Sequence, residues 1–144
     1  MHNILFVCTA NIFRSRFAEE VFNFLAIKEK IPARAFSAGL KVGEYHVRKI
    51  YRPALEQLDK FNIKPKRPNE LSVHIDEEEL TKYDQLICMD EAEHKPMVLS
   101  NSKLKEFNFE YWDIIDEPKV QSDVSLPICY NKVKKIVDGL KNKT

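Results

Sequence analysis

The sequence predicts a three-layer α/β protein: a central four-stranded parallel sheet with helices on both faces. Short apolar runs alternate with amphipathic stretches along the chain, which is typical of strands followed by crossover helices. Two of the runs, residues 4–7 and 85–89, are almost continuously apolar, as expected for strands buried on both faces. The 144 residues contain no repeat, low-complexity segment or linker. We therefore expect a single domain spanning residues 1–144.

The first half of the chain begins with a strand at residues 4–7. An amphipathic helix follows, because Phe17, Val21 and Leu25 fall within one arc of a helical wheel. A second short strand is predicted to end near residues 36–39. The order strand, helix, strand predicts a right-handed parallel crossover.

The middle of the chain contains three further predicted elements. A helix is predicted over residues 53–61, with a proline in its first turn. The acidic run 76–79 resembles the first turn of another helix, where negative charge suits the helix dipole. After the strand at 85–89, a short helix is predicted to start at Asp90 and to be kinked or delimited by Pro96.

The last predicted strand covers residues 107–112. A C-terminal helix is then indicated by an apolar face that includes Val133, Val137 and Leu140. Cys129 follows Pro127 and is expected to lie where this helix starts.

The composition excludes several classes of function. Lysine and arginine total 23 and aspartate and glutamate total 22, so nothing favours nucleic acid or an anionic membrane as a partner. No apolar run is long enough to span a bilayer, and the N-terminus lacks a secretory signal. Three widely spaced cysteines predict free thiols in a reducing, cytoplasmic compartment. The four histidines show no metal-ligand spacing, so neither a metal nor another cofactor is expected.

The residues between the first strand and the first helix predict a phosphate-binding loop after the first strand. A tight loop that runs into a helix N-terminus directs backbone N–H groups inward, and it would also stabilise a thiolate at Cys8. Arg14 adds a planar fork suited to two phosphate oxygens. The Ser15 hydroxyl could hydrogen-bond the sulfur. The pattern favours a cysteine that attacks phosphorus, and the alternative is a cysteine that is merely buried at the end of a strand.

A family resemblance extends this interpretation. Residues 6–15, Phe-Val-Cys-Thr-Ala-Asn-Ile-Phe-Arg-Ser, followed by Ala-Glu at 18–19, resemble the N-terminal signature of the low-molecular-weight protein tyrosine phosphatases. Phe-Ser-Ala-Gly at 36–39 is similar to the family's second strand and turn, and residues 83–90 are similar to its third strand. The resemblance covers nearly the whole chain, in the family's order and length.

The resemblance implies roles for individual residues. Cys8 would be the nucleophile that forms a phosphocysteine intermediate, and Arg14 would bind the phosphate. Asn11 would hold the loop open with Ser37 as its supporting hydrogen-bond partner, and Ser15 would lie beside the leaving thiolate. The remaining substrate-binding positions of the loop are Thr9, Ala10, Ile12 and Phe13.

The family also uses an aspartate, in an Asp-Pro pair on a late loop, as the general acid. This chain has a glutamate between Asp116 and Pro118. Alignment from the preceding strand selects Asp116, and counting back from the proline selects Glu117. Asp113 is a third alternative. We predict Asp116.

Two loop positions depart from the family pattern. Phe13 replaces a cysteine that often forms a protective disulfide with the nucleophile, so that redox switch is absent. Ala10 replaces a glycine, and a positive φ there would strain the loop by about 1 kcal/mol.

The expected substrates are phosphotyrosine-containing proteins or small aryl phosphates. Ile12 suits an aromatic ring, whereas relatives that act on phosphoarginine usually have threonine there. Tyr45 is predicted to stack on the substrate ring, with Tyr51 as a weaker candidate. Arsenate reductase, phosphoarginine phosphatase and an inactive phosphoprotein-binding module remain as alternatives. The closely spaced cysteine pair that thioredoxin-coupled arsenate reductases need is missing. The sequence makes no prediction of oligomeric state.

Overall fold

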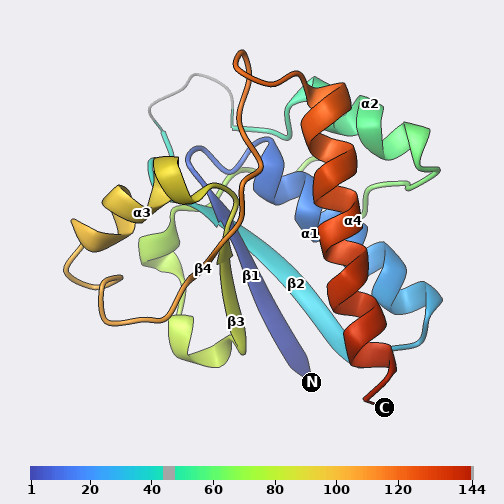
Figure 1. Ribbon diagram of the computed structural model, residues 1–144, viewed down its shortest axis with the longest axis horizontal. Helices are drawn as coiled ribbons and strands as arrows, with labels where there is room; N and C mark the ends of the chain where they lie inside the picture. Colours follow the sequence, from blue (N-terminus) through green and yellow to red (C-terminus); the bar gives the residue numbers. More distant parts are fainter. Residues whose placement is uncertain (44–47, 144) are drawn as a thin grey trace.

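The protein, described by a computed structural model over residues 1–43 and 48–143, has a four-stranded parallel sheet at its centre (Figure 1). The strands are β1 (His2–Cys8), β2 (Ala33–Gly39), β3 (Gln85–Cys88) and β4 (Glu110–Tyr111), and their order in the sheet is β2-β1-β3-β4. All three pairings are parallel. The predicted fold class is confirmed.

Helices cover both faces of the sheet, as predicted (Figure 1). On one face lie α1 (Arg14–Lys28), α2 (Arg52–Lys60) and α4 (Ser122–Lys141), and on the other lies α3 (Glu91–Leu99). None of the helices within residues 1–43 and 48–143 is long and apolar enough to cross a membrane.

Strand β1 lies between the two faces and supplies side chains to both. Ile4 and Phe6 pack with the residues of α1 and α4, whereas Leu5 and Val7 pack toward α3, and all four are completely buried. A strand with both faces covered must be apolar at every position, which explains the unbroken run in the sequence. Cys8 continues the Ile4–Phe6 face, so its side chain is directed toward the start of α1.

The prediction of a helix at the acidic run 76–79 is wrong. Two short 3₁₀ turns, Ile75–Glu77 and Leu80–Lys82, occupy this region. The first turn has a capping box in which the His74 side chain accepts from the Asp76 N–H, and it ends at Glu78, whose backbone is extended. A helical turn does begin at the acidic run, but the backbone leaves helical geometry after that one turn.

The last strand and the last helix also differ from prediction. Strand β4 contains only two residues because β3 ends at Cys88, which pairs with Tyr111. Helix α4 begins at Ser122, five residues before Pro127, so Cys129 lies within the helix and not at its start. Pro96 lies inside α3 and does not delimit it.

The carboxyl ends of β1 and β2 meet at Gly39. The N–H groups of Leu40 and Lys41 donate to the carbonyls of Cys8 and Thr9 at 2.9 and 2.8 Å. A Cβ atom on Gly39 would lie 2.8 Å from the Thr9 carbonyl oxygen and 3.0 Å from the Asn11 nitrogen. Glycine is needed here because the backbone that follows β1 approaches β2 too closely for any side chain.

Candidate active site

The loop between β1 and α1, residues 8–15, folds around the sulfur of Cys8. The Asn11 N–H points at Cys8 Sγ at 3.3 Å, and Ser15 Oγ lies 2.9 Å from the same sulfur. Ser15 is the second residue of α1, so the sulfur faces the N-terminal end of that helix. This end carries unpaired N–H groups and a partial positive charge, both of which favour an anion at the sulfur.

The side chain of Asn11 determines how Ser15 meets the sulfur. Asn11 Oδ1 accepts from the Val73 N–H at 3.0 Å, so its Nδ2 must be the atom that donates to Ser15 Oγ at 2.9 Å. Ser15 already accepts this hydrogen bond, which leaves its own proton for Cys8 Sγ. The three side chains form a donor chain that ends on the sulfur and would stabilise it as a thiolate.

Two sequence expectations for this loop are corrected. The positive φ belongs to Asn11, at 57°, and not to Ala10, so the alanine introduces no strain of that kind. Asparagine is one of the few non-glycine residues that adopt this conformation readily. Ser37 does not support Asn11: it donates to Glu19, whose buried carboxylate needs donors and also receives Arg67 Nε at 2.7 Å.

We predict that Asn11→Ala lowers the free energy of unfolding by about 2 kcal/mol or more, because it removes the partner of the part-buried Val73 N–H and places alanine at positive φ. Urea denaturation followed by circular dichroism measures the loss. Asn62→Ala is the matched control, since Asn62 has a φ of 59° but makes no side-chain hydrogen bond within the described residues. Equal losses for the two variants would show that the side-chain bonds of Asn11 contribute nothing.

Arg14, the first residue of α1, lies almost completely buried beneath this loop. Its Nη1 donates to the Ile114 carbonyl at 3.0 Å, and its Nη2 donates to Glu93 at 2.9 Å. Asp116 Oδ2 lies 3.4 Å from the same Nη2. Burial alone would lower the pKa of Arg14, but the charge of Cys8 and the bond to Glu93 outweigh it and raise the pKa. Arg14 is therefore a permanent cation under the loop.

A pocket of about 470 Å³ opens above the loop and collects most of the predicted residues. Ile12 and Phe13 line one part of it, and Tyr51 joins them through an edge-on contact with Phe13 at 5.5 Å between ring centres. Tyr51 also donates its N–H to the Ile12 carbonyl. The predicted stacking residue, Tyr45, lies outside the described residues. The full lining is Cys8, Thr9, Ala10, Ile12, Phe13, Arg14, Tyr51, Glu93, Asp116 and Glu117.

Of the three candidate acids, the structure brings two to this pocket. Asp116 and Glu117 both line it, whereas Asp113 is exposed, is absent from the lining and pairs with Lys132 at 3.7 Å. Glu117 accepts the Ser122 N–H at 3.3 Å, so its carboxylate is engaged at the start of α4. Burial raises the pKa of Asp116 despite the opposing charge of Arg14, and the charge of Glu93 raises it further. A raised pKa suits a carboxyl group that must carry a proton.

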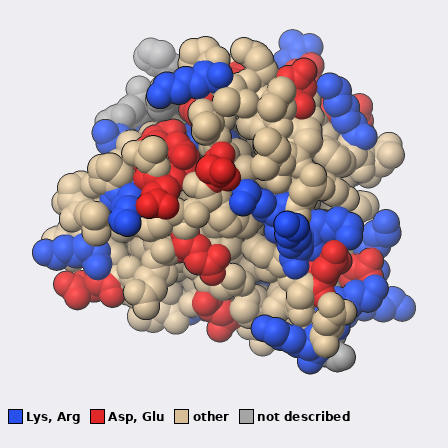
Figure 2. All heavy atoms as spheres, viewed as in Figure 1, with Lys and Arg blue, Asp and Glu red and all other residues tan. Residues whose placement is uncertain are grey.

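Glu93 is the site residue that the sequence did not reveal. It lies in the first turn of α3 and accepts hydrogen bonds from Thr9 Oγ1, Arg14 Nη2 and the ring of His94. Burial alone would raise the pKa of Glu93, but these three hydrogen bonds hold it well below its usual range. One signal in the sequence was available: Glu93 closely follows the carboxyl end of a parallel strand, where ligand sites form. Figure 2 shows acidic side chains gathered over this end of α3.

The other two cysteines are free, and neither of them lines the pocket above Cys8. Cys88 is completely buried and packs on the α3 face of the sheet, opposite to Cys8, as the apolar strand predicted. Cys129 is completely buried within α4. Burial raises the pKa of Cys129 to about 12, with weaker opposing effects of Arg14 and Lys132, and it raises the pKa of Cys88 as well.

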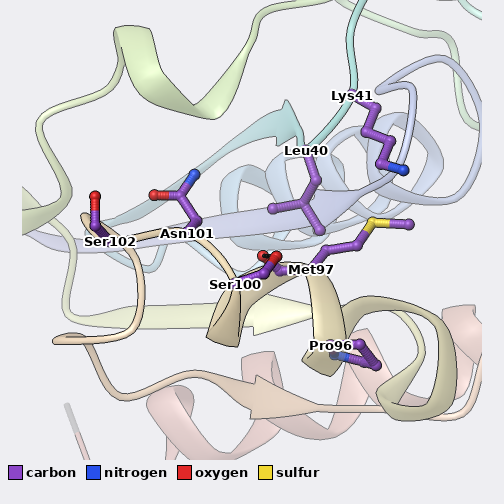
Figure 3. Close-up of a pocket in the computed structure, with 7 residues that line it drawn as sticks. All are labelled: Leu40, Lys41, Pro96, Met97, Ser100, Asn101 and Ser102. Atoms are coloured by element: carbon purple, nitrogen blue, oxygen red, sulfur yellow. Dashed lines mark hydrogen bonds between the residues drawn. The ribbon is translucent and has the colours of Figure 1, made fainter.

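A second and larger hollow, of about 590 Å³, lies between α3 and the residues that follow β2 (Figure 3). Leu40 and Met97 form its apolar part, and Lys41 lies at one end. No cysteine or carboxylate lines it, and none of the predicted site residues does. The pocket above Cys8 is therefore the candidate active site.

Comparison with known proteins agrees with this geometry. The family model of the low molecular weight phosphotyrosine protein phosphatases matches residues 3–143. The chain belongs to this family. A search of curated proteins gave no significant match. Membership supports a phosphatase, and the resemblance predicted from the sequence is confirmed.

Several solved structures share the fold. YfkJ from Bacillus subtilis superposes with a TM-score of 0.83 at 23% identity, covering 100% of this chain and 97% of that one. The YwlE arginine phosphatase, also from Bacillus subtilis, gives 0.73 at 22% identity, with 98% and 94% covered. An arsenate reductase from Archaeoglobus fulgidus gives 0.70 at 24% identity, with 94% and 98% covered. At these identities the likeness shows the fold and leaves the substrate open.

Proposed function

We propose that this protein is a cysteine-dependent phosphatase that hydrolyses aryl phosphate monoesters, with phosphotyrosine in proteins as its substrate class. One observation carries the proposal: the Asn11–Ser15–Cys8 donor chain ends on a sulfur that lies in the same pocket as a buried arginine. Arg14 Nε is buried and has no hydrogen-bond partner among the described residues. An unfilled N–H beside a stabilised thiolate is the arrangement that a phosphate ester would complete.

The first chemical step transfers the phosphoryl group to the enzyme. The Cys8 thiolate attacks phosphorus, the phosphorus–sulfur bond forms, and the bond from phosphorus to the phenolic oxygen breaks. Asp116 gives its proton to that departing oxygen, so the leaving group is a neutral phenol. Arg14 and the loop N–H groups stabilise the charge spread over the three remaining oxygens.

The second step returns the enzyme to its starting state. Water attacks the phosphocysteine, and Asp116, now a carboxylate, accepts a proton from that water. The phosphorus–sulfur bond breaks and inorganic phosphate leaves. Ser15 Oγ, 2.9 Å from the sulfur, stabilises the thiolate as it departs.

The preference for an aryl ester rests on the apolar part of the pocket. Ile12, Phe13 and Tyr51 line it together, and an aromatic ring gains by leaving water for such a surface. Phosphoarginine is a second candidate, because the carboxylates Glu93, Asp116 and Glu117 also line the pocket and could pair with a guanidinium group. Arsenate reduction is disfavoured because Cys88 packs on the other face of the sheet and Cys129 is completely buried within α4.

The experiment is a direct comparison of substrates with the purified protein. We expect release of phosphate from p-nitrophenyl phosphate and from a phosphotyrosine peptide at about pH 6, with a higher kcat/KM than for free phosphoarginine. Arsenate with thioredoxin should give no arsenite. A higher kcat/KM for phosphoarginine would move the assignment to the second candidate, and no hydrolysis of any ester would refute the proposal.

A further inference from the structure

The carboxylate of Glu93 is held by donors from three parts of the chain. Thr9 Oγ1 reaches it from the 8–15 loop, Arg14 Nη2 from α1 at 2.9 Å, and the ring of His94 from α3 at 3.1 Å. His94 is completely buried, and its Nδ1 accepts the Asp90 N–H at 3.1 Å. Its proton therefore lies on Nε2, which is 3.0 Å from Thr9 Oγ1 and 3.1 Å from the Glu93 carboxylate. These contacts place a carboxylate inside the phosphate pocket.

The free donors of Arg14 define where a phosphate would bind relative to Glu93. Nη1 is used by the Ile114 carbonyl and Nη2 by Glu93, and Nε has no partner among the described residues. A phosphate engages an arginine through two adjacent N–H groups, and Nε with Nη2 is the edge that still has an unfilled donor. One phosphate oxygen would then share Nη2 with Glu93, which brings that oxygen close to the carboxylate.

Two negatively charged oxygens on one nitrogen repel each other, and a proton between them removes the repulsion. A phosphate ester that keeps one P–OH group can donate it to the Glu93 carboxylate, whereas a dianion cannot. The low pKa of Glu93 leaves the phosphate as the partner that carries the proton. The other titratable groups around Glu93 are Cys8 and Arg14 beneath it, His94 on its own helix, and Asp116 and Glu117 on the segment before α4.

We propose that Glu93 is a specificity-determining residue that makes this pocket bind the singly protonated, monoanionic form of a phosphate monoester in preference to the dianion. The inference rests on the proposed function, because it concerns the same pocket and the same class of substrate. It goes further in naming the charge state that binds and the side chain that selects it.

Calorimetric titration with phenyl phosphate tests the proposal in a Cys8→Ala background, where neither turnover nor the thiolate charge interferes. Above the ester's second pKa, about 6, the association constant should fall about tenfold per pH unit. Adding Glu93→Gln should weaken this dependence and tighten binding about tenfold at pH 8, a change equivalent to one unit of pKa. Glutamine keeps the size of the side chain and an oxygen for Arg14 and Thr9.

Glu91→Gln in the same background is the matched control. Glu91 lies in the same first turn of α3 and carries the same charge, but it is 61% exposed, pairs with Lys95 and does not touch Arg14. This variant should follow the pH dependence of Cys8→Ala alone. Thermal melts of all three proteins establish that each is folded before binding is compared.

Three results would overturn the inference: an unchanged pH dependence in the Glu93→Gln protein, weaker binding of that protein at every pH, or no binding by any of the three proteins. The second result would mean that Glu93 holds Arg14 in place and does not select charge. The proposed function fails separately, if the unaltered protein hydrolyses no ester while the Cys8→Ala protein still binds phenyl phosphate with a Glu93-dependent response to pH.

Discussion

Replacing Cys8 with serine is expected to reduce hydrolysis of p-nitrophenyl phosphate by about 10⁴-fold or more, because a serine hydroxyl is not ionised near neutral pH and the mechanism has no other nucleophile. The surrounding donors are arranged for an anion: Ser15 Oγ at 2.9 Å and the Asn11 N–H at 3.3 Å both face the sulfur. Steady-state release of p-nitrophenolate measures the loss. Mass spectrometry of the acid-quenched unaltered protein should find phosphate on Cys8.

Cys88→Ala is the control for this experiment. Cys88 pairs with Val7 of β1, packs on the face of the sheet opposite to that of Cys8 and is completely buried. Its replacement removes a small apolar group from the core, so the protein should be somewhat less stable and retain its turnover. If Cys88→Ala lost activity and Cys8→Ser retained it, the assignment of Cys8 as the nucleophile would be wrong.

Asp116→Asn should lower kcat by about 10²- to 10⁴-fold, the usual contribution of a general acid. The loss should be larger for phenyl phosphate than for p-nitrophenyl phosphate, because phenolate is the poorer leaving group and depends more on the donated proton. Burial and the charge of Glu93 raise the pKa of Asp116, and the acid form is the active one. In the unaltered protein kcat should therefore fall as the pH rises through this raised pKa. The asparagine variant should lack that limb of the profile.

Glu117→Gln distinguishes the two carboxylates that line the pocket. Glu117 already accepts the Ser122 N–H, so we expect its amide variant to keep turnover within a few-fold of the unaltered protein. The reverse pattern would make Glu117 the acid. Stability gives an independent check on Asp116: a carboxyl whose pKa is raised by folding disfavours the folded state once it ionises. The melting temperature of Asp116→Asn above that pKa should therefore not fall.

Much of the fold could be read from local patterns. The apolar run that became β1 has its side chains buried on both faces, and no other element accommodates such a run at that length. The helix after it followed from the spacing of Phe17, Val21 and Leu25, and all three are buried in α1. Predictions failed where non-local contacts decided the outcome. The length of β4 depends on where β3 ends, and no pattern within residues 107–112 records this.

The active site also has a part that the sequence predicted and a part that depends on non-local contacts. Residues 8–15 are contiguous, so their order already predicted a cysteine, a nest of N–H groups and an arginine in one loop. The partners that complete the site come from elsewhere in the chain. The hydrogen bond that orients Asn11 comes from the Val73 N–H and not from the predicted Ser37. Two N–H groups of Arg14 donate to the Ile114 carbonyl and to the Glu93 carboxylate. These contacts join residues that are 62 to 100 positions apart in the sequence.

The sequence by itself determined the family, the layered architecture and a cysteine and an arginine at the two ends of one loop, because each of these depends on residues that are neighbours in the chain or repeat with a regular period. Only the tertiary structure decided which carboxylates share the pocket with Cys8. Glu93 reaches it because α3 starts beside the 8–15 loop, and Asp116 reaches it because the segment before α4 passes over Arg14. Their charges act through space, and distance in space is set by the packing of the sheet and helices.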